Sequence, residues 1–404
     1  MLNRGLLAAA ALALSPGAAG CAQSLDKTLM DLAMGSAYQP PSGPALRAAV
    51  PPSRYLLLAG DFHCHVSPPD SDGHVSRGLD DTIELARRER LDFVVLTPHI
   101  RRRFFQEPAL RERALGAHAY LRERLAREFT GPVLFVPGFE YTDGLYGHVG
   151  LSFGDLEGTL AALPPGEASE HPERFFEKYV ASGGVLTVNH PFLEPVRSPF
   201  SFTGYDLSWR PFTSAEPLPP EIAAVDRAAQ AYEAFNLNVA HLRDRLLLGD
   251  EDRSLEATLA RLDREIPRRQ KRMAPVGGSD SHSYYLRATT FVLAESKTAR
   301  GVRDAVLAGR TCVRNPRACS LQVRGDEGGW RGVGGAVRAR DSVAVRAAGE
   351  TLRVLVDGRA AAAPASGEVA VVPVPPGRCA IVRAAVDEGF SAPIYVNCPF
   401  AEGG

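Results

Sequence analysis

Two short polar motifs place potential metal ligands on one side of an extended chain. His63 and His65 are separated by a single residue, and Asp280 and His282 repeat that spacing. Alternate side chains of an extended strand point to the same face, so each pair can direct both members at one metal ion. Each motif also follows directly on a short apolar run. The spacing therefore predicts a metal site built at the ends of strands.

Three further residues of the same chemical type also close apolar runs. They are His99 after residues 93–98, Glu140 after residues 133–139, and His190 after residues 184–189. Imidazole and carboxylate groups are the ligands that zinc, manganese and iron accept in proteins. Five separate strand ends would thus supply metal-competent side chains, which points to one cluster at a common rim.

The elements needed to position that rim alternate between apolar runs and amphipathic stretches. The predicted strands are residues 55–63, 93–98, 133–141, 148–153, 184–190, 231–235, 274–278 and 289–293. The predicted helices between them include residues 79–90, 109–127 and 173–181. Continuous apolar strands of this kind are typical of a mainly parallel sheet covered by helices. The repetition predicts an α/β barrel.

The motifs together resemble those of the polymerase-and-histidinol-phosphatase (PHP) superfamily over residues 55–312. The matching segments, in order, are Asp61-Phe-His-Cys-His65, Ser71-Asp-Gly73, residues 91–99, Gly138-Phe-Glu140, Asn189-His-Pro191 and Gly278-Ser-Asp-Ser-His282. The resemblance implies a distorted (β/α)7 barrel with two or three metal ions at its C-terminal rim. With the features of both chain ends described below, the layout is similar to the carbaryl-hydrolase-like branch of that superfamily.

The resemblance also implies the roles of individual residues. Asp72 is expected to be a ligand, although it lies two residues further from His65 than is usual, and Asp70 or His74 are the alternatives. Glu140 is expected to bridge two ions. His148 is expected either to be a further ligand or to have a structural role. The residues predicted to act in catalysis as well are Glu140, His190 and His282.

The predicted ligands indicate hydrolysis of a small-molecule substrate by a metal-activated water, because clustered divalent ions lower the pKa of water. The sequence does not choose among zinc, manganese and iron, nor among phosphoester, ester and carbamate bonds. The run Arg101, Arg102 and Arg103 is interpreted either as a grip for an anionic group or as a solvated charge run. The other function class is a catalytically inactive, surface-anchored lipoprotein that binds metal or ligand.

The first residues have the pattern of an export signal, with Arg4, an apolar run at residues 6–14 and a small-residue stretch before Cys21. The resemblance of residues 18–21 to a bacterial lipobox predicts cleavage before Cys21 and lipidation of its thiol. We therefore expect a signal peptide at residues 1–20, a tether at 21–53 and a membrane-anchored lipoprotein that faces the periplasm or the cell surface. Ordinary secretion is the alternative.

The remaining chain is divided into a barrel at residues 54–316 and a small β-sandwich-like domain at 317–404, where short alternating strands replace helices. Export permits disulfides, and local pairing of Cys312 with Cys319 and of Cys379 with Cys398 is preferred among three connectivities. Cys64 is expected to pack rather than to ligate. The formal net charge of −1 gives no reason to expect nucleic acid as a partner. The sequence indicates no oligomeric state.

Overall fold

The computed structural model describes residues 54–128, 130–143, 146–192, 208–213, 217–238 and 251–401. The predicted signal peptide, the lipidation site Cys21 and the predicted tether lie outside these residues. Among the described helices, none is both long enough and apolar enough to cross a bilayer.

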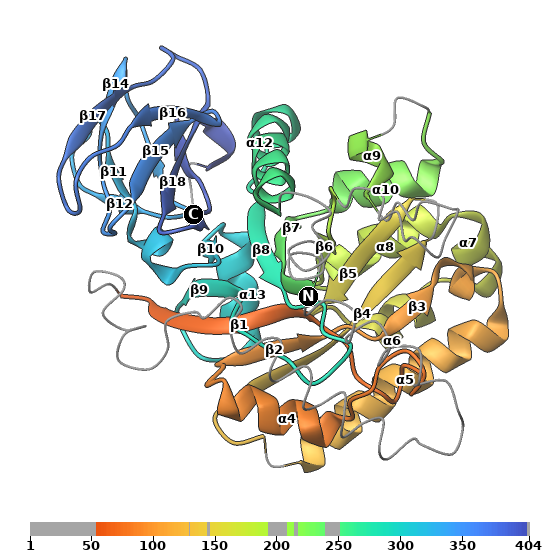
Figure 1. Ribbon diagram of the computed structural model, residues 1–404. Helices are drawn as coiled ribbons and strands as arrows, with labels where there is room; N and C mark the ends of the chain where they lie inside the picture. The colour runs from red at the N-terminus through yellow and green to blue at the C-terminus, as the bar shows by residue number, and fades with distance from the viewer. Residues whose placement is uncertain are drawn as a thin grey trace, which may run out of the picture.

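The first part of the described chain is a mixed α/β structure with a large sheet (Figure 1). Its strands are β1 (Leu56–Cys64), β2 (Phe93–Leu96), β3 (His99–Arg101), β4 (Leu134–Asp143), β5 (Gly147–Ser152), β6 (Val185–Val188), β7 (Ala231–Asn236), β8 (Ala274–Gly278), β9 (Thr290–Ala294) and β10 (Thr311–Val313). Every strand predicted between residues 55 and 293 is present. The short strand β3 was not predicted.

Helices connect these strands and cover the outside of the sheet (Figure 1). They are α4 (Leu79–Arg88), α5 (Pro108–Arg127), α6 (Leu156–Ala161), α7 (Pro165–Glu170), α8 (Pro172–Ala181), α9 (Arg210–Thr213), α10 (Pro220–Ala228), α12 (Glu251–Arg269) and α13 (Ala299–Leu307), with the 3₁₀ helix η1 (Arg102–Phe105). Helix α4 has acids in its first turn and arginines in its last, which the helix dipole favours. The three predicted helices are confirmed.

Hydrogen bonding links the strands in the order β9-β1-β2-β4-β5-β6-β7-β8. All neighbours from β1 to β8 are parallel except β5, which runs antiparallel to both β4 and β6. The end of β8 returns to the end of β1, because Cys64 and Ser281 form a bridge and Asp280 N donates to His63 O at 2.8 Å. The ends of β1, β8 and their neighbours therefore meet at one rim. A closed barrel of seven strands stays a prediction.

The chain after β10 consists mainly of strands, as predicted. They are β11 (Gln322–Arg324), β12 (Arg331–Gly332), β13 (Ala336–Val337), β14 (Ser342–Arg346), β15 (Leu352–Val356), β16 (Arg359–Ala362), β17 (Ala370–Pro373), β18 (Ala380–Val386), β19 (Gly389–Ser391) and β20 (Ile394–Val396), with the 3₁₀ helices η2 (Pro316–Ser320) and η3 (Pro399–Ala401). Strands β12-β11-β14-β17 form a separate sheet, but β19 pairs with β10 and extends the large one. Division into two domains stays a prediction.

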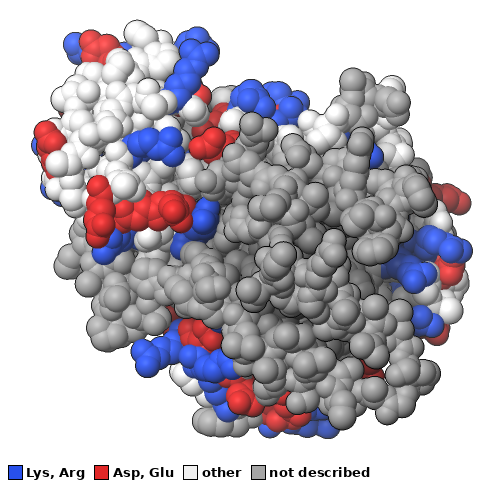
Figure 2. Space-filling model, viewed as in Figure 1, with Lys and Arg blue, Asp and Glu red and all other residues white. Residues whose placement is uncertain are grey.

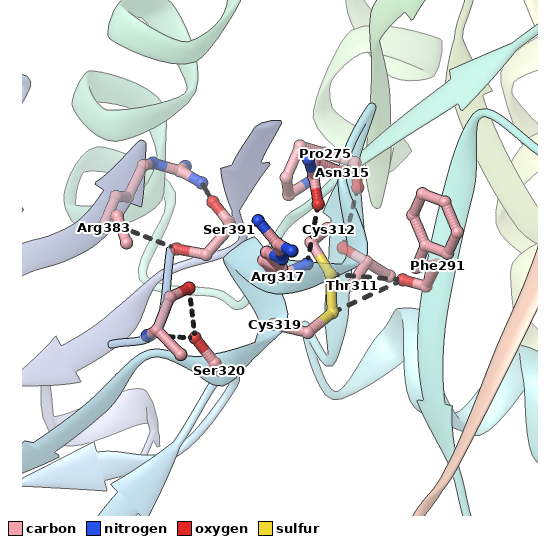
Figure 3. Close-up of a disulfide and its surroundings, with 12 residues drawn as sticks. Pro275, Phe291, Thr311, Cys312, Asn315, Arg317, Cys319, Ser320, Arg383 and Ser391 are labelled. Atoms are coloured by element: carbon pink, nitrogen blue, oxygen red, sulfur yellow. Dashed lines mark hydrogen bonds between the residues drawn. A yellow bond between two sulfur atoms is a disulfide. The ribbon is translucent and has the colours of Figure 1, made fainter. Parts of the chain in front are cut away.

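Both predicted disulfides are confirmed. The Cys312–Cys319 bond joins β10 to η2 with a Cα–Cα distance of 5.6 Å, and its surroundings include Phe291 of β9 and Ser391 of β19 (Figure 3). The Cys379–Cys398 bond has a Cα–Cα distance of 4.4 Å. The first bond therefore crosslinks the segment through which the α/β part connects to the C-terminal strands.

Charged side chains of both signs are interspersed over the described surface of the face in Figure 2. That distribution agrees with a formal net charge of −1. On this face, no continuous basic surface is seen among the described residues. The absence of a nucleic-acid partner stays a prediction.

Candidate metal centre

His63 and His65, at the end of β1, direct their Nε2 atoms at the same point. The two Nε2 atoms are 3.1 Å apart, and both side chains are buried. Each ring has a carboxylate at its other nitrogen, with His63 Nδ1 3.1 Å from Glu233 Oε1 and His65 Nδ1 3.1 Å from Asp70 Oδ2. A carboxylate at Nδ1 fixes that proton there and leaves the Nε2 lone pair free.

Two carboxylates from other strands lie close to these two Nε2 atoms. Asp280, directly after β8, has Oδ1 3.4 Å from His63 Nε2 and 3.2 Å from His65 Nε2. Glu140 of β4 has Oε1 3.1 Å from His63 Nε2. His63, His65 and Asp280 thus form one group whose ligand atoms all lie within 4.8 Å of one another.

Glu140 also belongs to a second group, with His148 of β5 and His190 directly after β6. Its Oε1 is 3.1 Å from His148 Nδ1 and 3.5 Å from His190 Nε2. Asn189 Nδ2 donates to the same oxygen at 2.9 Å and holds the carboxylate in place. Glu140 therefore lies between the two groups, where a bridging carboxylate would stand. His148 lies with the predicted ligands, and its role as one stays a prediction.

A third group consists of His65, His99 and His282. The ring of His65 stacks on that of His99 and on that of His282, with centroid distances of 4.1 and 4.0 Å, and the centroids of His99 and His282 are 5.5 Å apart. The ring of His74 packs against these two rings, at 4.8 Å from His99 and 4.7 Å from His282. His99 Nε2 is 3.2 Å from Glu140 Oε2 and thereby joins this group to the others.

Asp72 is not brought into any of these groups. It is exposed, and it accepts a hydrogen bond from Ser67 Oγ. The two alternatives lie beside the cluster. Asp70 contacts the Nδ1 atoms of both His65 and His99, and the ring of His74 packs against His99 and His282. Residues 66–78 form a loop without strand periodicity, so sequence spacing could not decide which side chain turns inward. Asp72 as a ligand stays a prediction, and Asp70 and His74 stay the alternatives to it.

Sequence reasoning missed two buried residues of β7, Glu233 and Asn236. Glu233 contacts His63 as described, and its Oε2 accepts from His190 N at 2.8 Å. Asn236 Nδ2 lies 3.1 Å from Glu233 Oε2 and 3.2 Å from Asp280 Oδ2. A glutamate inside the otherwise apolar segment Ala231–Asn236 was the available signal.

Burial and neighbouring charge shift the pKa values of the cluster in opposite directions. Burial alone would lower the pKa of His63, but Asp280, Glu233 and Glu140 raise it well above its usual range. For His65 burial is likewise outweighed by hydrogen bonds to Asp280 and Asp70, and its pKa rises to about 9. Without another cation, the site would therefore hold protons on these two rings.

The carboxylates show the complementary shift. Burial alone would raise the pKa of Glu140 and of Asp280, but His148 and His63 beside Glu140, and His63 and His65 beside Asp280, lower both. The pKa of His282 falls to about 4, through burial and through repulsion from His65. Burial raises the pKa of Asp61 to about 7, although hydrogen bonds from Ser279 and from His63 N oppose this. The centre thus combines anionic carboxylates with a neutral imidazole at the rim.

The other sequence candidates lie apart from the cluster. Cys64 is fully buried, its thiol is 3.1 Å from Arg77 Nη2, and burial raises its pKa to about 12. It belongs to none of the described ligand groups, and its role in packing stays a prediction. His118 lies on α5 with its Nδ1 3.6 Å from Glu157, and His171 is exposed beside Glu173. His241 lies outside the described residues.

The three arginines after His99 have different surroundings. Arg101 ends β3 and is exposed. Arg102 stacks over the ring of Tyr146 at 5.6 Å. Arg103 is paired with Glu107 one helical turn further along the chain. Of the three guanidinium groups, that of Arg101 is therefore best placed to contact a substrate.

The residues at this centre fit transition-metal ions. Two imidazole lone pairs that face each other at 3.1 Å repel unless a cation or a shared proton lies between them. Among the described residues, His190 Nδ1 and His148 Nδ1 are also buried without a hydrogen-bond partner, although the latter is close to Glu140. The donor set of imidazole and carboxylate groups is typical of zinc, manganese and iron sites. These ligand assignments remain a prediction.

No family model matches this chain, and no curated protein does. Solved structures to which it is similar include a two-domain protein containing a predicted PHP-like metal-dependent phosphoesterase from Bacteroides vulgatus, at 15% identity. That match covers 86% of this chain and 96% of the other, with a TM-score of 0.42. PsfC from Pseudomonas syringae is 18% identical, and the match covers 63% of this chain and 89% of the other with a TM-score of 0.36. A lesion-specific endonuclease Q from Pyrococcus furiosus is 14% identical, and the match covers 62% of this chain and 56% of the other with a TM-score of 0.36. Because these TM-scores lie below 0.5, we infer function from this chain's own residues.

Proposed function

We propose that this protein is a metal-dependent hydrolase that holds two or three zinc, manganese or iron ions at the rim formed by the ends of β1, β4, β6 and β8. The observation that carries the proposal is the pair of Nε2 atoms of His63 and His65, 3.1 Å apart. Their Nδ1 protons are held by Glu233 and Asp70, so both lone pairs are left for a cation.

We assign the proposed ligands to the metal ions as follows. His63, His65 and Asp280 would hold one ion, and Glu140 with His148 and His190 a second. His99 and His282, which are grouped with His65, would offer nitrogen ligands for a third. Divalent ions bound there lower the pKa of water and stabilise the charge that develops on the electrophile. Burial and repulsion from His65 lower the pKa of His282 to about 4, and its side chain is partly exposed at the rim. Its Nδ1 lies 2.9 Å from Asp280 O, so Nε2 is the nitrogen that would face an ion or a water molecule.

The strand register supports a substrate that carries an anionic group. Arg101 pairs with Thr142 of β4, which pairs with His148 of β5. Directly paired residues point to the same face of a sheet, so Arg101 lies on the face that carries His99, Glu140 and His148. A guanidinium at this position would bind a phosphate or carboxylate beside the metals. Among the bonds compatible with this chemistry, a phosphomonoester fits best, and carboxylic esters and carbamates follow.

The proposal is tested by activity of the purified protein against chromogenic phosphomonoester, phosphodiester, carboxylic ester and carbamate substrates, each with zinc, manganese and iron. We expect metal-dependent turnover that is highest with the phosphomonoester. Binding of about two metal ions per chain without turnover of any substrate would favour the alternative of an inactive metal-binding protein.

The role of Arg101 is tested by Arg101→Ala. We expect KM for the phosphomonoester to rise roughly 10- to 100-fold, because a charge-assisted contact of about 1.5–3 kcal/mol is lost. KM for an uncharged ester should stay the same. Arg127→Ala serves as the matched control, since Arg127 is an exposed arginine on α5 paired with Glu123. Equal effects of both variants would contradict a substrate contact at Arg101.

We further propose export and lipid anchoring at Cys21, which the sequence motif supports. Cys21→Ser should release the protein from the membrane fraction, and continued membrane association of this variant would contradict lipidation there. The closer resemblance to the carbaryl-hydrolase-like branch also remains a proposal, and it predicts measurable hydrolysis of the carbamate in the substrate panel.

A further inference from the structure

Glu233 of β7 contacts two of the strand ends that supply the proposed ligands and is linked through Asn236 to a third. Its Oε1 is 3.1 Å from His63 Nδ1, and its Oε2 accepts from the backbone N–H of His190 at 2.8 Å. The side-chain amide of Asn236, three residues further along β7, donates to Glu233 Oε2 and to Asp280 Oδ2. Glu233 is 2% exposed, so water does not compete for these contacts.

We propose that Glu233 is a positioning residue that sets the tautomer of His63 and, with Asn236, aligns His63, His190 and Asp280 for metal binding. The inference rests on the proposed metal-dependent function and extends it to a residue that is not itself a ligand. Carboxylates that accept the second N–H of a ligating imidazole fix its tautomer and orientation, and their loss weakens metal binding by about 10- to 100-fold.

The backbone around Glu233 is shaped to permit this contact. Gly278, the last residue of β8, lies so close to both partners that a Cβ placed there would be 2.2 Å from Glu233 Oε1 and 2.2 Å from His63 Cβ. His190 adopts a positive φ of 28°, which few non-glycine residues do. The hydrogen bond from His190 N to Glu233 supports that conformation. The local chain geometry is therefore built around the carboxylate.

The two proposed orienting acids act on different groups. Glu233 contacts His63 and His190, whereas Asp70 contacts His65 and His99. Loss of Glu233 should therefore weaken the group of His63, His65 and Asp280 and the group of Glu140, His148 and His190. Loss of Asp70 should instead weaken the group of His65, His99 and His282 more strongly. This difference separates positioning from a general loss of stability.

The test is Glu233→Gln in the full-length protein, compared with Asp70→Asn. Glutamine keeps the shape but offers a single oxygen, so its amide N–H must face either His63 Nδ1 or the donors of His190 and Asn236. Zinc affinity is measured by competition with a chromophoric chelator. We expect the dissociation constant of the tightest site to rise about 10- to 100-fold in Glu233→Gln, and a different site to be weakened most in Asp70→Asn.

The matched control is Asp263→Asn. Asp263 is also a buried acid, and its Oδ1 accepts from Arg383 Nε at 2.5 Å on the side of α12 that faces the C-terminal strands. This variant should lower the melting temperature but leave all zinc dissociation constants unchanged. If Glu233→Gln lowers the melting temperature as Asp263→Asn does and binds zinc as tightly as the wild type, then Glu233 has only a structural role.

A second measurement reads the tautomer directly. In the zinc-loaded protein labelled with ¹⁵N-histidine, we expect His63 to carry its proton on Nδ1 and to bind through Nε2. Coordination through Nδ1 would overturn the inference even if the proposed function is correct. Failure of the wild-type protein to bind zinc, manganese or iron would instead contradict the proposed function itself.

Discussion

Two clusters of buried acids in this protein differ in the basic side chains that face them. At the metal centre, Glu140 and Asp280 face imidazole rings. In the helix cluster of α10 and α12, which consists of Asp226, Glu265, Arg261, Arg268 and Arg269, the acids face guanidinium groups. There Arg269 binds Asp226 at 2.6 Å and Glu265 at 2.7 Å.

The difference separates acids whose partners are always charged from acids whose partners can lose their charge. Arginine is always charged, so the helix cluster is neutralised by the chain itself. Burial alone would raise the pKa of Glu265, but hydrogen bonds from Arg268 and Arg269 lower it. Imidazole can be neutral, and at the metal centre the ring nitrogens face one another. The proposed metal centre can therefore exchange protons for metal ions. The helix cluster of α10 and α12 can only stabilise the fold.

The largest expected contrast comes from removing a ligand. His63→Ala or Asp280→Ala should lower kcat/KM by about 10³-fold or more, because several kcal/mol of transition-state stabilisation depend on the metals. Bound metal, measured by elemental analysis, should fall in the same variants. Full activity in either one would remove these residues from the centre.

The next effect concerns stability rather than activity. Arg269→Ala should lower the free energy of unfolding by about 3–5 kcal/mol, because it leaves two buried carboxylates without this partner. Denaturant unfolding measures this loss. Metal content and kcat per bound metal should stay at the wild-type level, and a loss of bound metal in the folded variant would break the distinction between the two clusters.

A smaller effect is expected from pH in the metal-free protein. The pKa of His65 is raised from 6.5 to about 9 in the folded state, and that of His63 is raised as well. A raised pKa means that the folded protein binds more protons, so this contribution is present below pH 6.5 and is lost as the pH rises through 9.

We therefore expect the melting temperature of the metal-free protein to fall between about pH 6.5 and 9. Metal-loaded protein should not show this fall, because an ion replaces the protons and binds more tightly at higher pH. Identical pH profiles of the two forms would show that the rings do not exchange protons for metal.

The smallest effect is expected at Cys64. Cys64 stands between the proposed ligands His63 and His65 in the sequence. Its side chain is fully buried and contacts Arg77. Cys64→Ala should cost about 1 kcal/mol of stability through lost packing, with the number of bound ions unchanged. Thermal unfolding and metal analysis measure the two quantities, and loss of an ion in this variant would identify the thiol as a ligand.

Strand periodicity predicted most of the centre. His63, His65, Glu140 and Asp280 could be placed because each ends an apolar run whose direction the sheet dictates, and parallel strand ends meet at one edge. The strands themselves were predicted by the same apolar runs. Local pairing of the cysteines was only the preferred one of three connectivities, and the structure confirms it.

Two kinds of residue could not be placed in this way. Asp70, Asp72 and His74 lie in one loop, where no repeating pattern decides which side chain turns inward. Glu233 lies within a strand, and only its contact with His63 from a distant part of the chain reveals that its carboxylate faces the centre. Spatial relations between separate loops and strands therefore supplied what sequence spacing could not.

The most direct test of the central claim is the number of metal ions per chain after reconstitution of the purified protein with zinc, manganese or iron and removal of excess metal. The proposed centre predicts at least two ions per chain for one of these metals, with His63→Ala reducing that number. Less than one ion per chain with all three metals would contradict it.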